Sequence, residues 1–237
     1  MPPLDRSLIR ALPPFSAMDE RALDAIIAQA TSQRVPQGET VFRQGEVAKS
    51  FFVLLHGRLK VVKVAPDGSQ FVVRFVNPGD LFGIAKALRR PDYPATALAL
   101  VDSVTLVWPN AIWDDLVAAH PTFAGNVMQA MGQRLDEAHT RLTELSTEEV
   151  AARVAHTLLR LVKQSGREVQ EGVVFDFPLT QQDIAEAAGT TLHSVSRVFG
   201  AWEKAGLVTT GRRKIVVHDV GGLAALAGQS LGRAGSL

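Results

Sequence analysis

The sequence predicts an α+β protein with three successive parts: a β-rich N-terminal half, one long helix, and a C-terminal winged helix-turn-helix. Three observations predict this class. Short β-branched and aromatic runs separated by glycines fill residues 35–108. An apolar seam with alternating spacings of four and three residues covers 124–145. A short capped helix, a glycine and a second amphipathic helix follow at 179–204.

Composition limits the classes of function. The 237 residues are 46% hydrophobic and 21% charged, which is ordinary for a soluble globular chain of one or two domains. The chain has no cysteine, which excludes disulfides, zinc–thiolate sites, cysteine-ligated iron–sulfur clusters and thiol nucleophiles. No apolar run approaches the roughly 20 residues that span a bilayer, and the N-terminus lacks a signal pattern. We therefore expect a cytoplasmic protein without a membrane partner.

The N-terminal half begins with a predicted helix from Met18 to Thr31. The glycines at 57, 68 and 79 repeat every 11 residues, an interval typical of all-β rolls and barrels. Pro66-Asp67-Gly68 predicts a tight turn between two of the strands. Periodicity alone does not distinguish a β-sandwich from a ligand-binding roll. The expected strands are 41–42, 51–55, 59–64, 71–76 and 98–107.

The middle of the chain predicts a dimerisation helix. A mean spacing of 3.5 residues keeps an apolar seam facing a partner helix, whereas a helix packed on its own globular domain usually shows a wider apolar stripe. The alternative is a helix that lies on its own β-domain. The seam residues are Ala124, Met128, Met131, Leu135, Ala138, Leu142 and Leu145.

The last third predicts two short helices around a glycine turn, preceded by a helix over 148–163. Thr180 and Asp183 have the spacing of a capping box, with Leu179 and Ile184 as its hydrophobic staple. Gly189 ends the first short helix, and the second begins near Thr191. Residues 167–172 are a variable polar stretch, and residues 221–237 predict a glycine- and alanine-rich tail.

The second short helix has a polar outer face suited to DNA. Arg197 can donate two hydrogen bonds to a guanine in a major groove, and a Gly-Arg-Arg-Lys turn between two β runs predicts a wing. Five basic residues and one acid lie between 197 and 214, a local positive patch within a net charge of +1. The alternative is a purely structural helical corner. The candidate DNA-binding residues are Thr180, Thr191, His193, Ser194, Ser196, Arg197, Lys204, Arg212, Arg213 and Lys214.

Six segments together resemble the CRP/FNR family of bacterial transcription regulators over nearly the whole chain. They are FRQGE at 42–46, LHGRLKV at 55–61, PGDLFG at 78–83, LTQQDIA at 179–185, SVSRV at 194–198 and GRRKI at 211–215. The resemblance implies a jelly roll like that of cyclic-nucleotide-binding domains, and a homodimer that binds a palindromic double-stranded operator and contacts RNA polymerase. The implied domains are a sensing roll at 1–109, a dimerisation helix at 110–146, a winged helix-turn-helix at 147–220 and a tail at 221–237.

Two positions depart from relatives that bind cyclic AMP. Ile84 stands where those relatives have a ribose-binding acid, and Ala95 where they have a phosphate-binding arginine. A buried phosphate without its cation is costly, so we do not expect cyclic AMP as the effector. On the reading helix, His193 stands where many relatives have glutamate. The expected effector pocket comprises Phe82, Gly83, Ile84, Ala95, Thr96, Met128 and Met131.

The signal is predicted to be a gas or redox cue. Residues 92–97 are similar to the nitric-oxide-responsive, haem-linked branch of the family, and haem would need an axial ligand such as His56, His120, His139 or His156. The alternatives are a cyclic-nucleotide-dependent regulator and a stand-alone ligand-binding module without DNA function. The sequence has no phosphate-binding loop, nucleophile elbow or metal-spaced histidine pair, so we do not expect an enzyme.

Overall fold

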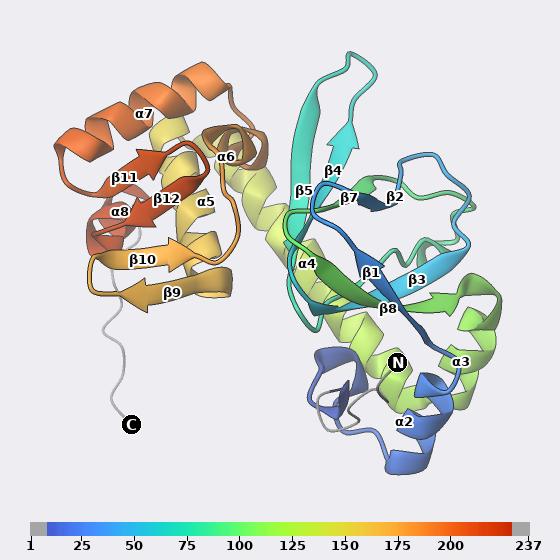
Figure 1. Ribbon diagram of the computed structural model, residues 1–237. Helices are drawn as coiled ribbons and strands as arrows, with labels where there is room; N and C mark the ends of the chain where they lie inside the picture. Colours follow the sequence, from blue (N-terminus) through green and yellow to red (C-terminus); the bar gives the residue numbers. More distant parts are fainter. Residues whose placement is uncertain (1–8, 229–237) are drawn as a thin grey trace. The chain divides into compact units, whose positions relative to one another are not determined.

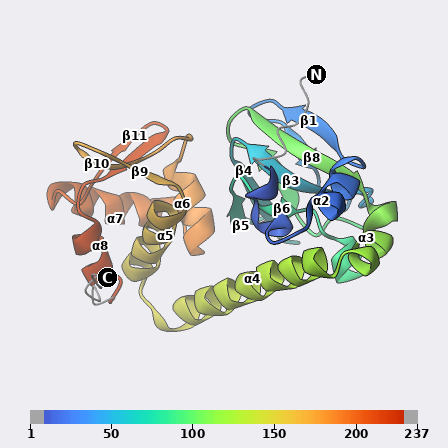
Figure 2. The same ribbon diagram turned by 90° about the horizontal axis from the view of Figure 1, so that it is seen from below.

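The computed structural model describes residues 9–228, which divide into two compact units with their boundary between Ala138 and His139. The helix α4 (Pro121–Thr147) runs from the first unit into the second without a break (Figure 2). The other helices of the first unit are α2 (Glu20–Ile27) and α3 (Trp113–Ala119), with 3₁₀ turns η1 (Pro13–Phe15), η2 (Lys86–Leu88) and η3 (Asn110–Ile112).

Two antiparallel four-stranded sheets form the roll of the first unit (Figure 1). One has the order β1-β8-β3-β6, made of β1 (Thr31–Val35), β8 (Ser103–Pro109), β3 (Ser50–His56) and β6 (Leu81–Phe82). The other has the order β2-β7-β4-β5, made of β2 (Thr40–Phe42), β7 (Thr96–Ala99), β4 (Leu59–Val64) and β5 (Gln70–Val76). The predicted β-rich half is therefore confirmed as a roll of paired sheets.

The core of the roll follows the period of two of a β-strand. Along β3, Phe51 and Val53 belong to one buried cluster, which also contains Trp108. Phe52 and Leu54, on the opposite face of the strand, belong to a second cluster with Phe42, Phe82 and Tyr93. Both faces of β3 are thus buried, which explains its nearly continuous apolar sequence.

Helix α4 contributes to the first of these clusters from a face that shares only Met131 with the predicted seam. Phe123 and Val127 are buried there, and Met131 packs against it partly buried. Phe123 stacks on Phe15 with ring centroids 6.1 Å apart. The helix therefore carries two apolar stripes: one covers the roll, and the other comprises the exposed members of the predicted seam.

One strand prediction for the roll needs correction, and one hairpin has an irregularity that the strand ranges do not predict. The expected strand 98–107 is two strands, β7 and β8, because the chain turns at residues 100–102. In the β4–β5 hairpin the register shifts between Val61 and Val62. Beyond this bulge the pleat is reversed, so Val72 is buried whereas Phe71 and Val73 are exposed.

The second unit combines the C-terminal part of α4 with a helical layer and a small sheet. Its helices are α5 (Val150–Ser165), α6 (Gln181–Ala188), α7 (Leu192–Lys204) and α8 (Val220–Leu226). The sheet has the order β11-β12-β10-β9, made of β9 (Gly166–Val169), β10 (Gly172–Phe175), β11 (Val208–Gly211) and β12 (Lys214–Val217).

One hairpin and one helix of this unit were not predicted from the sequence. The polar stretch at 167–172 forms most of the β9–β10 hairpin, which lengthens the sheet of the wing to four strands. The expected tail starts with α8, whose Leu223 and Ala224 are buried. Residues 229–237 of the predicted tail lie outside the described residues.

Candidate nucleic-acid interface

The first helix of the helix-turn-helix, α6, begins with the predicted capping box. The Thr180 hydroxyl oxygen accepts a hydrogen bond from the Asp183 backbone N–H at 3.1 Å, and the Asp183 carboxylate accepts one from the Thr180 backbone N–H at 3.0 Å. Leu179 and Ile184, the predicted staple, are completely buried. These contacts fix the start of α6 by satisfying backbone donors that have no partner inside the helix.

Gly189 forms the turn between the two helices in the left-handed conformation, with φ +62°. A Cβ atom at this position would lie 2.7 Å from the Leu145 Cδ2 atom at the end of α4, so the turn and α4 are in close contact. The Arg153 guanidinium of α5 donates hydrogen bonds to the backbone oxygens of Ala188 at 3.2 Å and Glu148 at 2.8 Å. Sequence analysis did not identify Arg153, because its acceptors are backbone groups that carry no sequence signal.

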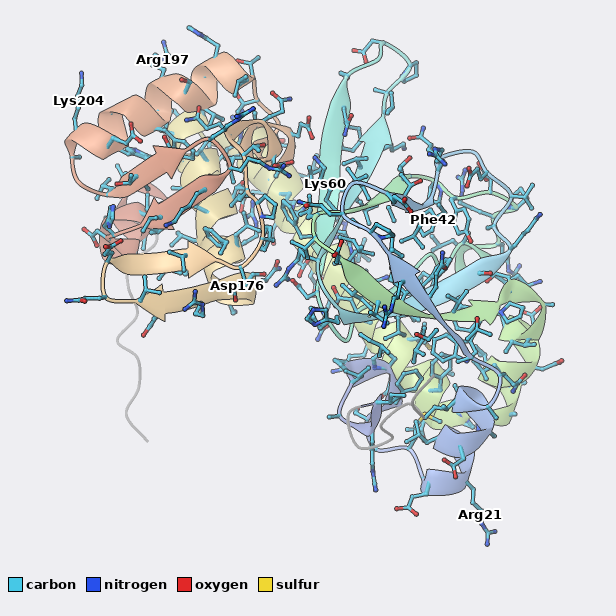
Figure 3. The ribbon with its side chains drawn as sticks, viewed as in Figure 1. Arg21, Phe42, Lys60, Asp176, Arg197 and Lys204 are labelled. Atoms are coloured by element: carbon cyan, nitrogen blue, oxygen red, sulfur yellow. The ribbon has the colours of Figure 1, made fainter. Side chains whose placement is uncertain are left out.

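The second helix, α7, presents its predicted polar face to solvent. Thr191 caps it by accepting a hydrogen bond from the Ser194 backbone N–H at 3.2 Å. Its opposite face buries Val195, Phe199 and Trp202 against the domain. Figure 3 shows Arg197 and Lys204 extending from the outer side of the ribbon. His193, Ser196, Arg197 and Lys204 are all exposed.

The wing adds three exposed cations, Arg212, Arg213 and Lys214, at the turn between β11 and β12. The one acid of the basic patch is Glu203, and its carboxylate accepts hydrogen bonds from the Thr210 backbone N–H and hydroxyl, both at 2.7 Å. That carboxylate is thus held against the wing, whereas Arg197 and Lys204 make no ion pair with any described residue. The outer surface of α7 and the wing is electropositive and suited to phosphates.

The expected effector residues differ in their surroundings. Phe82 and Ile84 are buried in different core clusters, and Ala95 is buried too. The Thr96 hydroxyl oxygen accepts a hydrogen bond from the Gln44 backbone N–H at 3.0 Å. Gly83 has φ +68° and lies against Phe52, while Met131 is half-buried and Met128 is 73% exposed on α4.

Two largely buried arginines near these residues escaped sequence analysis. Arg74 on β5 forms an ion pair with Asp80 at 3.0 Å, and Arg134 on α4 donates a hydrogen bond to the Leu81 backbone oxygen. Burial lowers the pKa of Arg134 to about 10, with a further lowering by the nearby charge of Arg74, so Arg134 stays charged at neutral pH. Arg74 interrupts the apolar run 71–76, which is the signal that could have identified it.

Each of the two units contains a segment that matches the model of a known protein family. Residues 32–120 match the model of the cyclic nucleotide-binding domain, and residues 152–226 match the Crp-like helix-turn-helix domain. The second match excludes the alternative of a ligand-binding module without DNA function. Among the described residues, no helix is long and apolar enough to cross a membrane.

Individual relatives cover nearly the whole chain. The cyclic AMP receptor protein of Thermus thermophilus is 27% identical over 89% of this chain and 94% of its own length. The transcriptional activator protein FnrA of Stutzerimonas stutzeri is 27% identical over 92% of this chain and 88% of its own length. A crystal structure of a CRP-family transcriptional regulator from Thermus thermophilus has 28% identity and a TM-score of 0.72, and the match covers 85% of this chain and 100% of that one.

These matches agree with the capped helices, the wing and the roll described above. They also confirm the prediction that the chain is not an enzyme, because its domains and relatives are those of transcription regulators. The chain belongs to the CRP/FNR family of DNA-binding transcription regulators.

Proposed function

We propose that the chain works as a homodimer that reads a palindromic operator through α7, under the control of a signal sensed in the roll. The observation that carries this proposal is the outer face of α7. There, Arg197 is exposed, makes no ion pair with any described residue, and stands next to the short polar side chain of Ser196. A helix with such a face can enter a major groove and contact base edges near its N-terminus.

The candidate residues divide into two roles. Arg197 reads a guanine through two hydrogen bonds, while Ser196 and His193 contact neighbouring bases. The remaining candidates contact phosphates and set the position of the helix on the duplex without reading sequence. These positioning residues are Thr180, Thr191, Ser194 and Lys204 around the two helices, with Arg212, Arg213 and Lys214 on the wing.

Dimerisation is supported by the exposed stripe of α4. Met128, Leu135 and Leu142 are 73%, 56% and 62% exposed, although they are spaced by seven residues on one side of the helix. A regular apolar stripe that is left in water favours association with a second copy of the same helix. A dimer would also present two copies of α7, as a palindromic operator requires.

The sequence specificity of Arg197 provides the test. We expect Arg197→Ala to weaken operator binding by about 1–3 kcal/mol and to leave weak, salt-sensitive binding to any duplex. Competition between an operator selected from random DNA and unrelated DNA measures this change. Arg167→Ala is the matched control, because it removes an exposed arginine of β9 that pairs with Asp176. Unchanged operator preference in Arg197→Ala would refute the reading role of α7.

The nature of the signal, a gas or redox cue, stays a prediction from the sequence. His156 is held by Glu148 at 3.1 Å, and His139 is exposed on α4. His56 lines a cavity of about 350 Å³, whose other lining residues are Arg34, Val35, Pro36, Asp102, Ser103 and Val104. A Soret band in the absorption spectrum of the protein purified from its host would support haem. The proposed contact with RNA polymerase rests on the family resemblance alone.

Cyclic AMP is less well supported as the signal than a gas or redox cue, although the relative from Thermus thermophilus is named a cyclic AMP receptor protein. The two cassette positions carry the buried apolar side chains of Ile84 and Ala95. The nearby cations, Arg74 and Arg134, are held by Asp80 and the Leu81 backbone oxygen. A nucleotide phosphate placed at this cassette would meet no charged side chain at either position.

A further inference from the structure

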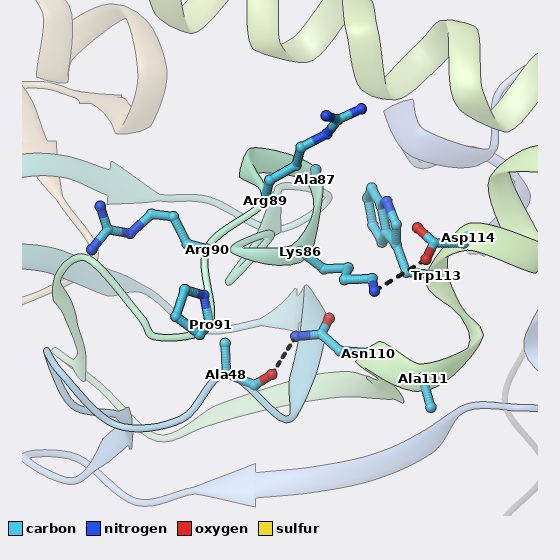
Figure 4. Close-up of a pocket in the computed structure, with 10 residues that line it drawn as sticks. All are labelled: Ala48, Lys86, Ala87, Arg89, Arg90, Pro91, Asn110, Ala111, Trp113 and Asp114. Carbon is cyan, nitrogen blue, oxygen red and sulfur yellow. Dashed lines mark hydrogen bonds and ion pairs between the residues drawn. The ribbon is translucent and has the colours of Figure 1, made fainter.

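The cations around the cavity of the first unit do not form a site of their own (Figure 4). This cavity, of about 790 Å³, lies beside η2 and the start of α3. Lys86 pairs with Asp114 at 3.0 Å, and Arg90 pairs with Asp92 at 3.0 Å. Figure 4 shows the Arg89 and Arg90 side chains turned away from the Lys86–Asp114 pair. The lining residues of the cavity therefore include no cluster of unpaired cations that could select a ligand.

In the second unit, Arg153 joins the link between α4 and α5 to the turn of the helix-turn-helix. It is half-buried near the start of α5. Its Nη1 atom donates a hydrogen bond to the Glu148 backbone oxygen at 2.8 Å, its Nε atom to the Ala188 oxygen at 3.2 Å, and its Nη2 atom to the Gly189 oxygen at 3.4 Å. Because the guanidinium is planar and rigid, these bonds hold the three oxygens in one arrangement.

The three acceptors belong to two different places in the chain. Glu148 directly follows α4, and its backbone N–H donates to the Glu144 oxygen of that helix at 3.0 Å. Ala188 is the last residue of α6 and Gly189 is its C-cap, so their carbonyls have no partner inside the helix. A guanidinium also complements the negative end of a helix dipole. Arg153 therefore ties the end of α4 to the end of α6.

Leu145 makes a second contact between the same two places. Its Cδ2 atom lies 2.7 Å from the position that a Cβ atom would take on Gly189. Thr191, the cap of α7, follows only two residues after that glycine. Because the turn is held by packing at one point and by hydrogen bonds at another, it cannot rotate on the end of α4 without losing one of them. The direction of α7 is thus fixed relative to the end of α4.

A small rotation at this joint would move α7 by about one base pair. The 13 residues of α7 extend over about 20 Å. A rotation of about 10° moves the far end of such a helix by about 3 Å, and neighbouring base pairs are about 3.4 Å apart along the duplex. In a dimer held by the stripe of α4 the joint occurs twice, so the distance between the two α7 helices depends on it.

We propose that Arg153 is a positioning residue that sets the half-site spacing of the operator by holding the helix-turn-helix on the end of α4. This inference rests on the proposed homodimer and on the proposed reading by α7. The hydrogen bond that caps α7 and the buried face of α7 do not involve Arg153, so each α7 can read its own half-site without it. Loss of Arg153 broadens the range of spacings that the dimer accepts and leaves base reading in place.

Fluorescence anisotropy on the full chain tests the proposal with three duplexes. They are the operator selected from random DNA, the same operator with one base pair inserted at its centre, and a duplex with a single half-site. One inserted pair turns a half-site by about 35°, so we expect the wild type to bind the inserted operator about tenfold more weakly. Arg153→Ala should reduce this ratio to about threefold or less, while binding to the single half-site changes by less than about twofold.

Variants on the same helix provide the controls. Arg153→Lys keeps a donor for one of the carbonyl oxygens, so its ratio should lie between those of the wild type and Arg153→Ala. Lys163→Ala removes an exposed cation at the other end of α5 and should keep the wild-type ratio. A thermal melt of each variant checks that the second unit is folded.

An unchanged ratio in Arg153→Ala would overturn the proposal, as would a wild type that binds the two spacings alike. An equal loss of binding to all three duplexes, together with a lower melting temperature, would also overturn it, because Arg153 would then only stabilise the fold. The proposed function fails by a different result, namely a wild type that binds the selected operator and unrelated DNA equally.

Discussion

Single residues at the start of α6 show how local chemistry defines the DNA-binding unit. Asp183 is a buried carboxylate, and it accepts hydrogen bonds from both the backbone N–H and the hydroxyl of Thr180, at 3.0 and 2.6 Å. A buried charge that is satisfied in this way stabilises one conformation of the helix start, whereas loss of its partner leaves it costly.

Thr180→Ala should destabilise the C-terminal unit by about 1–2 kcal/mol, because it removes the cap and a hydrogen bond to the buried Asp183. Hydrogen exchange of the α7 amides measures this change. Gln182→Ala, at an exposed position in the same turn, should change the stability by less than about 0.5 kcal/mol. Equal protection in the two variants would show that the cap does not hold α6.

At this scale, the sequence predicts contacts that are close along the chain and misses those that are not. The capping box and the staple follow from spacings of three and five residues. Arg153 and Arg134 bind backbone oxygens 35 and 53 residues away. Such acceptors exist at every residue, so no sequence pattern can single them out.

Among the elements, the β4–β5 hairpin combines features that the sequence pattern predicts with one that it does not predict. The Pro66-Asp67-Gly68 turn and the strand lengths follow from the sequence. The bulge does not. Val61 pairs with Arg74 and Val62 with Val72, so Val73 of β5 is the extra residue, and no spacing in the apolar pattern marks it. The same holds for the β9–β10 hairpin, in which β10 also pairs with β12, whereas β9 lies at the edge of the sheet and pairs with β10.

The glycine turn of the helix-turn-helix can be tested with a matched pair. Gly189 and Gly206 both have positive φ, at +62° and +72°, so an alanine at either position is strained by about 1–2 kcal/mol. Only at Gly189 would the new methyl group meet Leu145. We expect Gly189→Ala to cost about 1 kcal/mol more than Gly206→Ala in hydrogen exchange of α7. Equal losses would show that Leu145 moves aside freely.

The exposed stripe of α4 makes a second prediction at this scale. Leu135→Asp combined with Leu142→Asp should give monomers in sedimentation, because two charges on the seam would be desolvated in any dimer. Gln129→Asp with Gln133→Asp adds the same charge on the outer side of the helix and should leave the dimer intact. Dimers that persist in the seam variant would place the interface elsewhere.

For the whole molecule, a dimer that presents two α7 helices should require half-sites about one helical turn apart. Insertion of about five base pairs at the operator centre turns one half-site to the opposite side of the duplex. We expect gel shifts to show loss of tight binding for that operator and partial recovery with about ten inserted pairs. Equal binding to all three operators would mean that each chain reads its half-site independently.

The continuity of α4 across residues 138 and 139 has a consequence for how chains of this type can change in length. Each residue added to an α-helix rotates everything after it by about 100° and advances it by about 1.5 Å. A single insertion there would turn Leu142 and Leu145 off the stripe that holds Met128 and Leu135. Length variation should therefore accumulate in loops such as 65–69, while α4 should accept insertions only in steps of seven residues, which restore the original phase.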